Sequence, residues 1–146
     1  MQDQRDRQSR RSGFRTLIGY RTKVWREGYG EVELDIGPQH LNSLGVVHGG
    51  VHATLLDAAL GHAVSFCPVP GRTRYSTTVS LTTVFLKAAT AGVLTAVGRT
   101  EGLTGRLVTA SGELRDADGT LLATAQGSFL YFPGSEQPDG MPKRQR

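Results

Sequence analysis

Residues 45–60, GVVHGGVHATLLDAAL, place two glycines at the start of a helical pattern and one acid on its apolar body. Gly49 and Gly50 lie where the first amide N–H groups of a helix have no intrahelical acceptor. Those groups and the positive end of the helix dipole attract an anion or a polarised carbonyl oxygen, and glycine lets a substrate approach closely. The pattern predicts either an oxyanion site of the kind that acyl transfer requires or a tight turn into a helix.

The acid on this helix, Asp57, also calls for an explanation. A carboxylate in the middle of a mostly buried helix costs stability unless it is paired or used. No Lys or Arg stands one turn before or after it, so no pair within the helix is available. Two interpretations follow: Asp57 is a catalytic carboxylate, or it meets an arginine from a strand, such as Arg72 or Arg74.

The spacing of these groups constrains any site that contains both. At 1.5 Å per residue, Gly49 and Asp57 lie about 12 Å apart along one helix. That distance is too long for both to act on one carbonyl group. A shared site therefore requires two chains, and a two-fold dimer would contain two such sites, each combining the glycine of one chain with the aspartate of the other.

The helix that positions these groups is predicted over residues 48–66 and is closed by Pro68 and Pro70. Apolar side chains cover a broad arc of it, which is typical of a buried helix. The remaining narrow stripe is polar and small-sided, so another backbone or a slim ligand can approach it. That stripe consists of Thr54, Asp57, Gly61 and Ser65.

Strands are predicted on both sides of this helix. Alternating apolar and polar residues, separated by turn formers, indicate strands at 20–25, 31–36, 77–87, 92–101, 105–116 and 121–132. The short connections favour antiparallel pairing, and one long helix would cover one face of the sheet. The expected fold is α+β in a single domain at 14–133, with disordered tails at 1–13 and 134–146.

The charge distribution argues against a nucleic-acid groove. The net charge is +4, yet the two tails hold 7 Lys/Arg against 4 Asp/Glu, and residues 14–133 hold 10 against 9. No apolar run is long enough to span a bilayer. The single cysteine, Cys67, excludes an internal disulfide and fits a reducing compartment, so the expected location is the cytoplasm, with no membrane partner.

Three further side chains are interpreted as structural. His52 and His62 flank the apolar arc without an acid or a cysteine at ligand spacing, so packing with one hydrogen bond is favoured over a metal site. Cys67 has no base placed near it by the sequence, which argues against a cysteine nucleophile. No metal and no cofactor is therefore expected.

Three segments carry a resemblance to a known family: NSLGVVHGGVHATLLD (42–57), TTVSLTTVFLKAA (77–89) and DGTLLATAQGSF (118–129). They resemble the hotdog-fold acyl-CoA thioesterases, and most closely the phenylacetate-degradation, or PaaI-type, group. The resemblance covers roughly residues 15–132. It implies a curved antiparallel sheet wrapped around the long helix, and homodimers with intersubunit active sites that join as homotetramers.

The resemblance also implies roles for individual residues. Asp57 takes the place of the family's nucleophile or general base, and the backbone N–H of Gly49 that of the oxyanion donor. Asn42 matches a residue that helps to hold the attacking water or the thioester. Thr78 matches a hydroxyl near the acid, and His48 matches a histidine with a supporting role.

Other residues are expected to contact the substrate. Gly50, Thr54 and Gly61 offer room at the start of the helix and along its small-sided stripe. Lys87 and Arg106 match regions that line the nucleotide channel in relatives, and cations suit the phosphates of coenzyme A. Aspartate rather than glutamate at position 57 favours the PaaI-type group over hydroxybenzoyl-CoA and dihydroxynaphthoyl-CoA thioesterases.

The chemistry agrees with these parts. A thiolate is a good leaving group, with a reference pKa of about 8.5, so one carboxylate and N–H donors for the oxyanion could suffice. The sequence therefore predicts hydrolysis of an aryl-, short- or medium-chain acyl-CoA to free acid and coenzyme A. The alternatives are a non-catalytic acyl-CoA-binding protein of the same fold, and a hydratase, whose histidine and acid stand in a different register.

Overall fold

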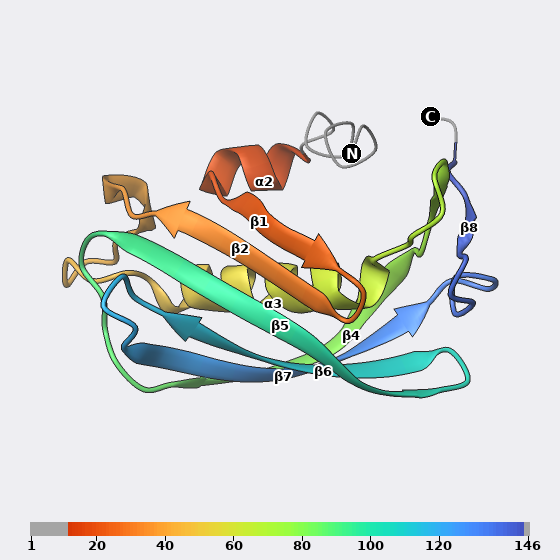
Figure 1. Ribbon diagram of the computed structural model, residues 1–146. Helices are drawn as coiled ribbons and strands as arrows, with labels where there is room; N and C mark the ends of the chain where they lie inside the picture. The colour runs from red at the N-terminus through yellow and green to blue at the C-terminus, as the bar shows by residue number, and fades with distance from the viewer. Residues whose placement is uncertain (1–11, 145–146) are drawn as a thin grey trace.

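A six-stranded antiparallel sheet curves around one long helix in the computed structural model, which describes residues 12–144 (Figure 1). The predicted helix and the six predicted strands are all present, with ends that differ by a few residues. The α+β hotdog fold is therefore confirmed. The elements are β1 (Arg21–Arg26), β2 (Tyr29–Asp35), α3 (Gly49–Ser65), β4 (Ser76–Phe85), β5 (Val93–Thr104), β6 (Leu107–Arg115) and β7 (Leu121–Tyr131).

Helix α3 packs one side against the concave face of the sheet. Its eight buried residues recur with helical spacing and include Leu55, Leu56, Ala59 and Leu60, none of which is exposed to solvent. The opposite stripe, predicted to be polar and small-sided, is half-buried along its whole length. The sheet therefore holds the helix firmly while leaving the stripe that contains Asp57 at the surface.

Two glycines allow the helix to approach the sheet this closely. A Cβ atom on Gly30 of β2 would lie 2.5 Å from the carbonyl oxygen of Ala59, and one on Gly98 of β5 would lie 2.6 Å from the same atom. No other residue type fits at these distances. Substitution of either glycine would push the helix outward and disturb the elements that it carries.

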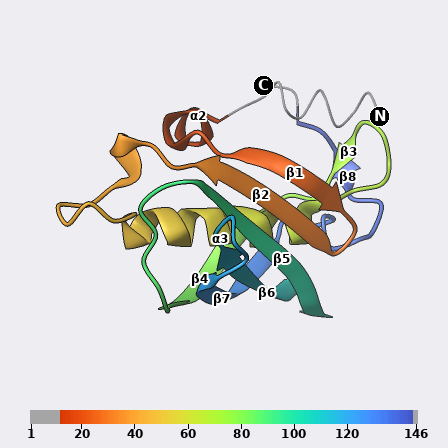
Figure 2. The same ribbon diagram turned by 60° about the vertical axis from the view of Figure 1, so that its left-hand side comes forward.

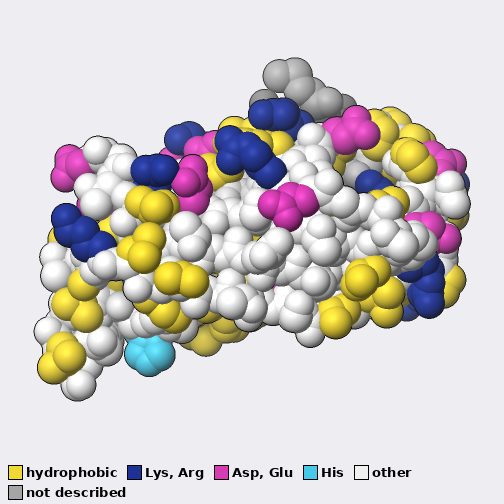
Figure 3. Space-filling model, turned by 90° about the horizontal axis from the view of Figure 1, so that it is seen from below, with side chains coloured by type: hydrophobic (Ala, Val, Ile, Leu, Met, Phe, Trp, Pro, Cys, Tyr) yellow, Lys and Arg dark blue, Asp and Glu magenta, His cyan; other side chains and the backbone are white. Residues whose placement is uncertain are grey.

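The two edges of the sheet differ in charge. The strand order β1-β2-β5-β6-β7-β4 makes β1 and β4 the edges. Lys23 and Arg21 of β1 both form ion pairs with Glu33 of β2. Strand β4 contains no charged residue, and Val84 and Phe85 are more than half exposed. On the underside of the molecule, hydrophobic side chains are scattered among uncharged and charged ones (Figure 3). The charged side chains of β1 therefore disfavour pairing of that edge with another strand, whereas the uncharged edge β4 is suited to such pairing.

The C-terminal segment is ordered, so the disordered tail predicted for 134–146 is wrong for the residues that are described. Strand β8 (Met141–Pro142) pairs with β3 (Arg72–Thr73) in a small separate sheet beyond the end of α3 (Figure 2). Arg72 and Arg74 donate hydrogen bonds to four carbonyl oxygens between residues 135 and 140. Composition does not reveal such order, because it comes from side chain to backbone hydrogen bonds rather than from apolar burial.

A short N-terminal helix, α2 (Gly13–Ile18), was not predicted from the sequence. Ser12 caps its start by accepting a hydrogen bond from the Arg15 N–H, and Gly19 ends it with a φ of 89°. The rest of the predicted N-terminal tail, residues 1–11, lies outside the described residues. Within residues 12–144, no helix combines the length and the apolarity needed to cross a membrane.

Candidate active site

The N-terminus of α3 presents one amide that the chain itself does not use. His48 is the N-cap, and its Nδ1 accepts a hydrogen bond of 2.8 Å from the Gly50 N–H. The next two amides of the helix reach the carbonyl oxygen of His48. Among residues 12–144, no acceptor meets the Gly49 N–H. This amide, at the positive end of a 17-residue helix, can therefore donate to an oxyanion.

The two glycines serve different purposes. A Cβ on Gly50 would lie 2.9 Å from His48 Nδ1, so glycine at 50 is required by the cap. A Cβ on Gly49 would lie 3.4 Å from the Phe85 ring, which is an ordinary contact. A side chain at 50 would therefore displace the His48 ring from its cap, whereas the space at 49 accepts a Cβ and the N–H of that residue stays free to donate. This separates the roles of two residues that the sequence shows only as a pair.

Asn42 organises the loop that leads into the helix. Its Oδ1 accepts hydrogen bonds from the N–H groups of Leu44 and Val46, at 2.9 and 3.3 Å. Its own N–H donates to the Val46 carbonyl at 2.8 Å, which closes the loop. The Nδ2 group makes no hydrogen bond with the described residues. The predicted contact of Asn42 with water or thioester is thus restricted to Nδ2.

The carboxylate of Asp57 is held by a hydroxyl group and not by a cation. Thr78 of β4 donates a hydrogen bond of 2.8 Å from Oγ1 to Oδ1 of Asp57. No Lys or Arg of the described chain forms an ion pair with it, and Arg72 and Arg74 bind the C-terminal segment instead. The ion-pair interpretation of Asp57 is therefore wrong, and the predicted pairing of Asp57 with Thr78 is present.

A residue that sequence reasoning did not assign to the site, Tyr20, lies within electrostatic range of Asp57. Burial raises the pKa of Tyr20, the positive charge of Arg15 lowers it, and the negative charge of Asp57 raises it again. The net pKa is higher than usual, so the phenol stays protonated and able to donate a hydrogen bond. Nothing in the local sequence relates Tyr20 to the helix. Its position just before β1 was the one signal that could have suggested that it lies near Asp57.

The remaining residues of the polar stripe flank Asp57. The Thr54 hydroxyl donates to the Gly50 carbonyl at 2.8 Å, so it is engaged within the helix. At Gly61, a Cβ would meet only the Phe129 ring, at 3.9 Å, so the absent side chain leaves room one turn beyond the acid. Gly49 and Asp57, in contrast, are separated by about 12 Å of helix, and one chain does not bring them together.

Lys87 and Arg106 lie at opposite ends of the sheet. Lys87 lies just beyond Phe85, the last residue of β4. Arg106 lies just before Leu107 of β6, and Leu107 has the same partner on β7 as Thr77 at the start of β4. At 3.3 Å per residue, this places the two cations about 30 Å apart. One chain therefore does not bring them to a common phosphate, and only Lys87 lies at the Gly49 end. Arg106 instead donates to the Tyr131 carbonyl at 3.1 Å.

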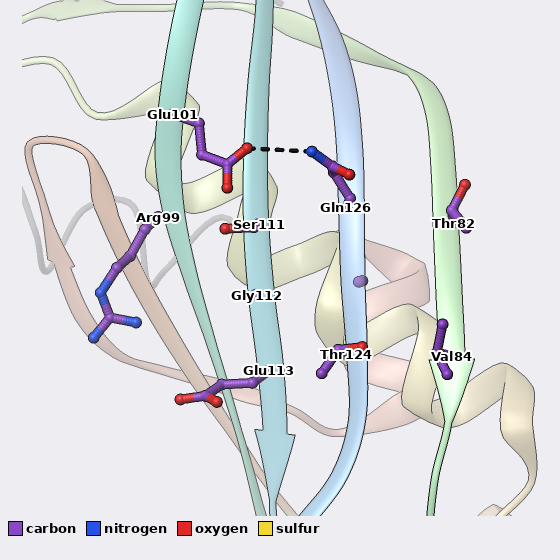
Figure 4. A pocket seen from close by; sticks show the side chains of 10 residues that line it. Thr82, Val84, Arg99, Glu101, Ser111, Gly112, Glu113, Thr124 and Gln126 are labelled. Carbon is purple, nitrogen blue, oxygen red and sulfur yellow. Dashed lines mark hydrogen bonds between the residues drawn. The ribbon is translucent and has the colours of Figure 1, made fainter.

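A hollow of about 600 Å³ lies on the opposite face of the sheet (Figure 4). Ser111 and Glu113 line it from either side of Gly112, whose missing Cβ faces α3, so these side chains point away from the helix. Across its upper part, Gln126 donates a hydrogen bond of 3.3 Å to Glu101. None of the predicted site residues lines this hollow, and the candidate site remains the half-buried polar stripe of α3.

The two histidines of the apolar arc differ in their hydrogen bonds. His62 meets Thr22 and the Ala58 carbonyl at 2.8 and 2.7 Å, as expected for a packing residue. His52 is 3% exposed, and neither ring nitrogen has a partner among residues 12–144, so the expected single hydrogen bond is missing. Within residues 12–144, no three His, Cys, Asp or Glu side chains are grouped so that they could hold a metal ion.

The buried imidazole of His52 should make the protein less stable in mild acid. Burial lowers its pKa below the usual 6.5, so the unfolded chain takes up a proton that the folded chain refuses. Stability is then lost as the pH falls below 6.5. We expect His52→Leu to raise the free energy of unfolding by about 1 kcal/mol at pH 7.5, and by more at pH 5.5. Urea unfolding at both values tests this, and an equal pH dependence in both proteins would contradict it.

Comparisons with known proteins identify the family and the fold of this chain. Residues 44–123 match the family model described as the thioesterase superfamily. A protein of Archaeoglobus fulgidus, named for an inferred esterase activity, is 31% identical over 113 residues, covering 77% of this chain and 70% of that protein. The conserved protein PA5202 of Pseudomonas aeruginosa has a TM-score of 0.78 at 28% identity, covering 86% of this chain and 98% of that one.

A third comparison concerns the group that the sequence resembles. The PaaI protein of Escherichia coli, from the phenylacetic acid degradation operon, superposes with a TM-score of 0.76 at 21% identity. It covers 90% of this chain and 91% of its own, and at that identity it shows the shared fold. The family model spans more than half of the chain, and the matched residues include the whole of α3, from Gly49 to Ser65. The chain therefore belongs to the thioesterase superfamily, a family of hydrolases.

Proposed function

We propose that the protein hydrolyses an aryl-, short- or medium-chain acyl-CoA thioester to the free acid and coenzyme A. The observation that carries this proposal is the environment of the Asp57 carboxylate. It is half-buried, and it accepts a hydrogen bond of 2.8 Å from the Thr78 hydroxyl. A hydrogen bond from Thr78 to Oδ1 fixes the carboxylate and leaves Oδ2 available. Structural acids of this kind are normally neutralised by a cation, which Asp57 lacks among the described residues.

The reaction follows from the chemistry of these groups. Asp57 takes a proton from water while the water oxygen bonds to the thioester carbon, or Asp57 attacks that carbon itself and water then cleaves the resulting anhydride. Negative charge that develops on the carbonyl oxygen is met by the Gly49 N–H. In either route the first tetrahedral intermediate collapses by breaking the C–S bond, and the coenzyme A thiolate leaves and takes up a proton, from Asp57 in the first route and from solvent water in the second. Thr78 keeps the carboxylate oriented throughout.

The site requires a second copy of the chain, and strand β4 is the surface that we propose for pairing. Its ten residues carry no charge, and exposed Val84 and Phe85 would otherwise face water. Thr78 lies near the start of the strand, beside Asp57, and Phe85 lies at its end, beside Gly49. When a strand pairs with its own copy about a two-fold axis, the start of one meets the end of the other. Asp57 of one copy then faces Gly49 of the second.

Mixing two inactive variants tests this arrangement. Asp57→Asn removes the base from one chain, and Gly49→Pro removes the N–H donor from the other. A dimer that contains one chain of each has one site with both groups intact and one site with neither. After unfolding and refolding of an equal mixture, thiol release should recover to about one quarter of the wild-type rate.

The control for this experiment is each variant refolded alone, which should keep no more than about 1% of the wild-type rate. If the mixture also stays inactive while size-exclusion chromatography shows dimers, Gly49 and Asp57 do not share a site. The joining of dimers into tetramers, and the cytoplasmic location, stay predictions, and sedimentation velocity measures the first of these.

The activity itself is tested by thiol release from phenylacetyl-, benzoyl-, butanoyl- and octanoyl-CoA, followed with a chromogenic disulfide. Turnover of at least one of them by the wild type supports the proposal, and the panel reports the acyl preference. The alternative, a non-catalytic acyl-CoA-binding protein, predicts saturable binding in calorimetry without turnover. The catalytic dependence on Asp57, treated in the Discussion, separates true turnover from a contaminating thioesterase.

A further inference from the structure

His40, in the loop before α3, forms hydrogen bonds through both of its ring nitrogens and through its backbone N–H and carbonyl groups. It is 2% exposed and ends a short 3₁₀ turn, η1 (Pro38–His40). The sequence GPQHLNSLG indicates only a loop at this position. Nothing in its spacing relates His40 to Gly49, nine residues away.

The protonation state of the ring follows from its partners. The Gly37 N–H donates to His40 Nδ1 at 2.9 Å, so Nδ1 carries no proton. The proton of the neutral ring is therefore on Nε2, which donates to the Ile18 carbonyl at 2.7 Å. Both ring nitrogens are satisfied, in contrast to those of His52. One side chain thus connects the 37–48 loop to the end of α2.

The backbone of the same residue leads directly to the helix cap. The His48 N–H donates to the His40 carbonyl at 2.8 Å, and the neighbouring pair Leu41 and Val47 forms a bridge. His48 in turn orients its ring to accept from Gly50. The position of the Gly49 N–H therefore depends on where His40 is held.

We infer that His40 is a positioning residue for the oxyanion donor: its Nε2–H bond to Ile18 fixes the loop that places the Gly49 N–H. The inference rests on the proposed function. A second external hydrogen bond, from the Val47 N–H to the Ala89 carbonyl at 2.8 Å, keeps the loop attached when the first is lost. Loss of the Ile18 link should therefore shift the donor rather than unfold the loop. Displacement of a catalytic group by about 1 Å can cost about 10²-fold in rate.

Two variants separate the two ring nitrogens. Asn places its oxygen where Nδ1 stands but does not reach Ile18, whereas the longer Gln side chain can donate to Ile18. We expect His40→Asn to lower kcat by about 10-fold or more with little change in KM, and His40→Gln to retain a kcat close to the wild type. Tyr131→Phe is the matched control, because it removes one buried hydrogen bond at the other end of α3, to the Val64 carbonyl. Its kcat should be unchanged.

Amide hydrogen exchange gives a second readout that does not require activity. Exchange at the His48 and Gly50 amides should be faster in His40→Asn than in His40→Gln or the wild type. Unchanged kcat and exchange in His40→Asn would overturn the inference, as would an equal loss in both variants. If His40→Asn does not fold, His40→Gln decides: a wild-type kcat supports the Ile18 link, and a 10-fold fall overturns it. If the wild type itself cleaves no thioester, the proposed function fails, and the exchange rates alone decide the role of His40.

Discussion

Asp57→Asn should lower kcat for thioester hydrolysis by about 10³-fold, the range found when a general base is removed. The substitution is close to isosteric, and the amide oxygen of asparagine can still accept the hydrogen bond that Thr78 donates to Oδ1 at 2.8 Å. The geometry of the site should therefore persist, while the charge and the basicity of the carboxylate are lost. Steady-state thiol release, with kcat and KM determined separately, measures the effect.

The matched control for this prediction is Asp35→Asn. Asp35 is also a carboxylate, but it lies at the end of β2, its side chain is 71% exposed, and it pairs with Arg21. An exposed ion pair of this kind contributes little to stability, so kcat and the free energy of unfolding should both stay near the wild-type values. A kcat within about two-fold of the wild type in Asp57→Asn would show that the carboxylate does not act in the chemical step.

Gly49→Pro should lower kcat by about 10²-fold, because it deletes a single oxyanion donor. Proline has no N–H, yet it is favoured at the first position of a helix, where that N–H has no intrahelical acceptor. The preceding residue, His48, has φ −61° and ψ 136°, which is the extended conformation that proline requires before it. The helix should therefore form normally in this variant, without its first amide proton.

Gly49→Ala separates the loss of the donor from the effect of added bulk. Alanine keeps the N–H, and its Cβ would meet the Phe85 ring at 3.4 Å, as the Cβ of proline would. We expect Gly49→Ala to retain most of the wild-type kcat. Circular dichroism and urea unfolding of both variants check that the helix is intact. An equal loss of activity in the two variants would assign the effect to crowding against Phe85 and not to the N–H group.

The helix and the strands could be predicted from the sequence because their signals are local. The apolar arc of α3 and the alternation in the six strands depend only on which residues follow one another. The cap could also be located, since His48 and the two glycines precede the apolar run directly. The distance between Gly49 and Asp57 followed from the same helix geometry, and it indicated a second chain before any fold was known.

Contacts between distant segments could not be predicted in this way. The order of the C-terminal segment depends on Arg72 and Arg74, which lie more than sixty residues before the carbonyl groups that they bind. The same arginines were candidates to pair with Asp57, and only the fold shows that they lie elsewhere. Long, flexible cations can reach many partners, so their sequence position says little about which partner they bind.

The roles of individual site residues divide along the same line. The sequence by itself determined that this chain carries an acid on a narrow polar stripe of a helix and a donor at the start of that helix, because both follow from the 3.6-residue period. The resemblance implied the hydroxyl of Thr78 beside the acid, but only the tertiary structure decided that Arg106 lies about 30 Å from Lys87 and that His40 bonds to Ile18 and to the helix cap. Those facts arise from strand register and loop closure, which bring together residues that no local pattern relates.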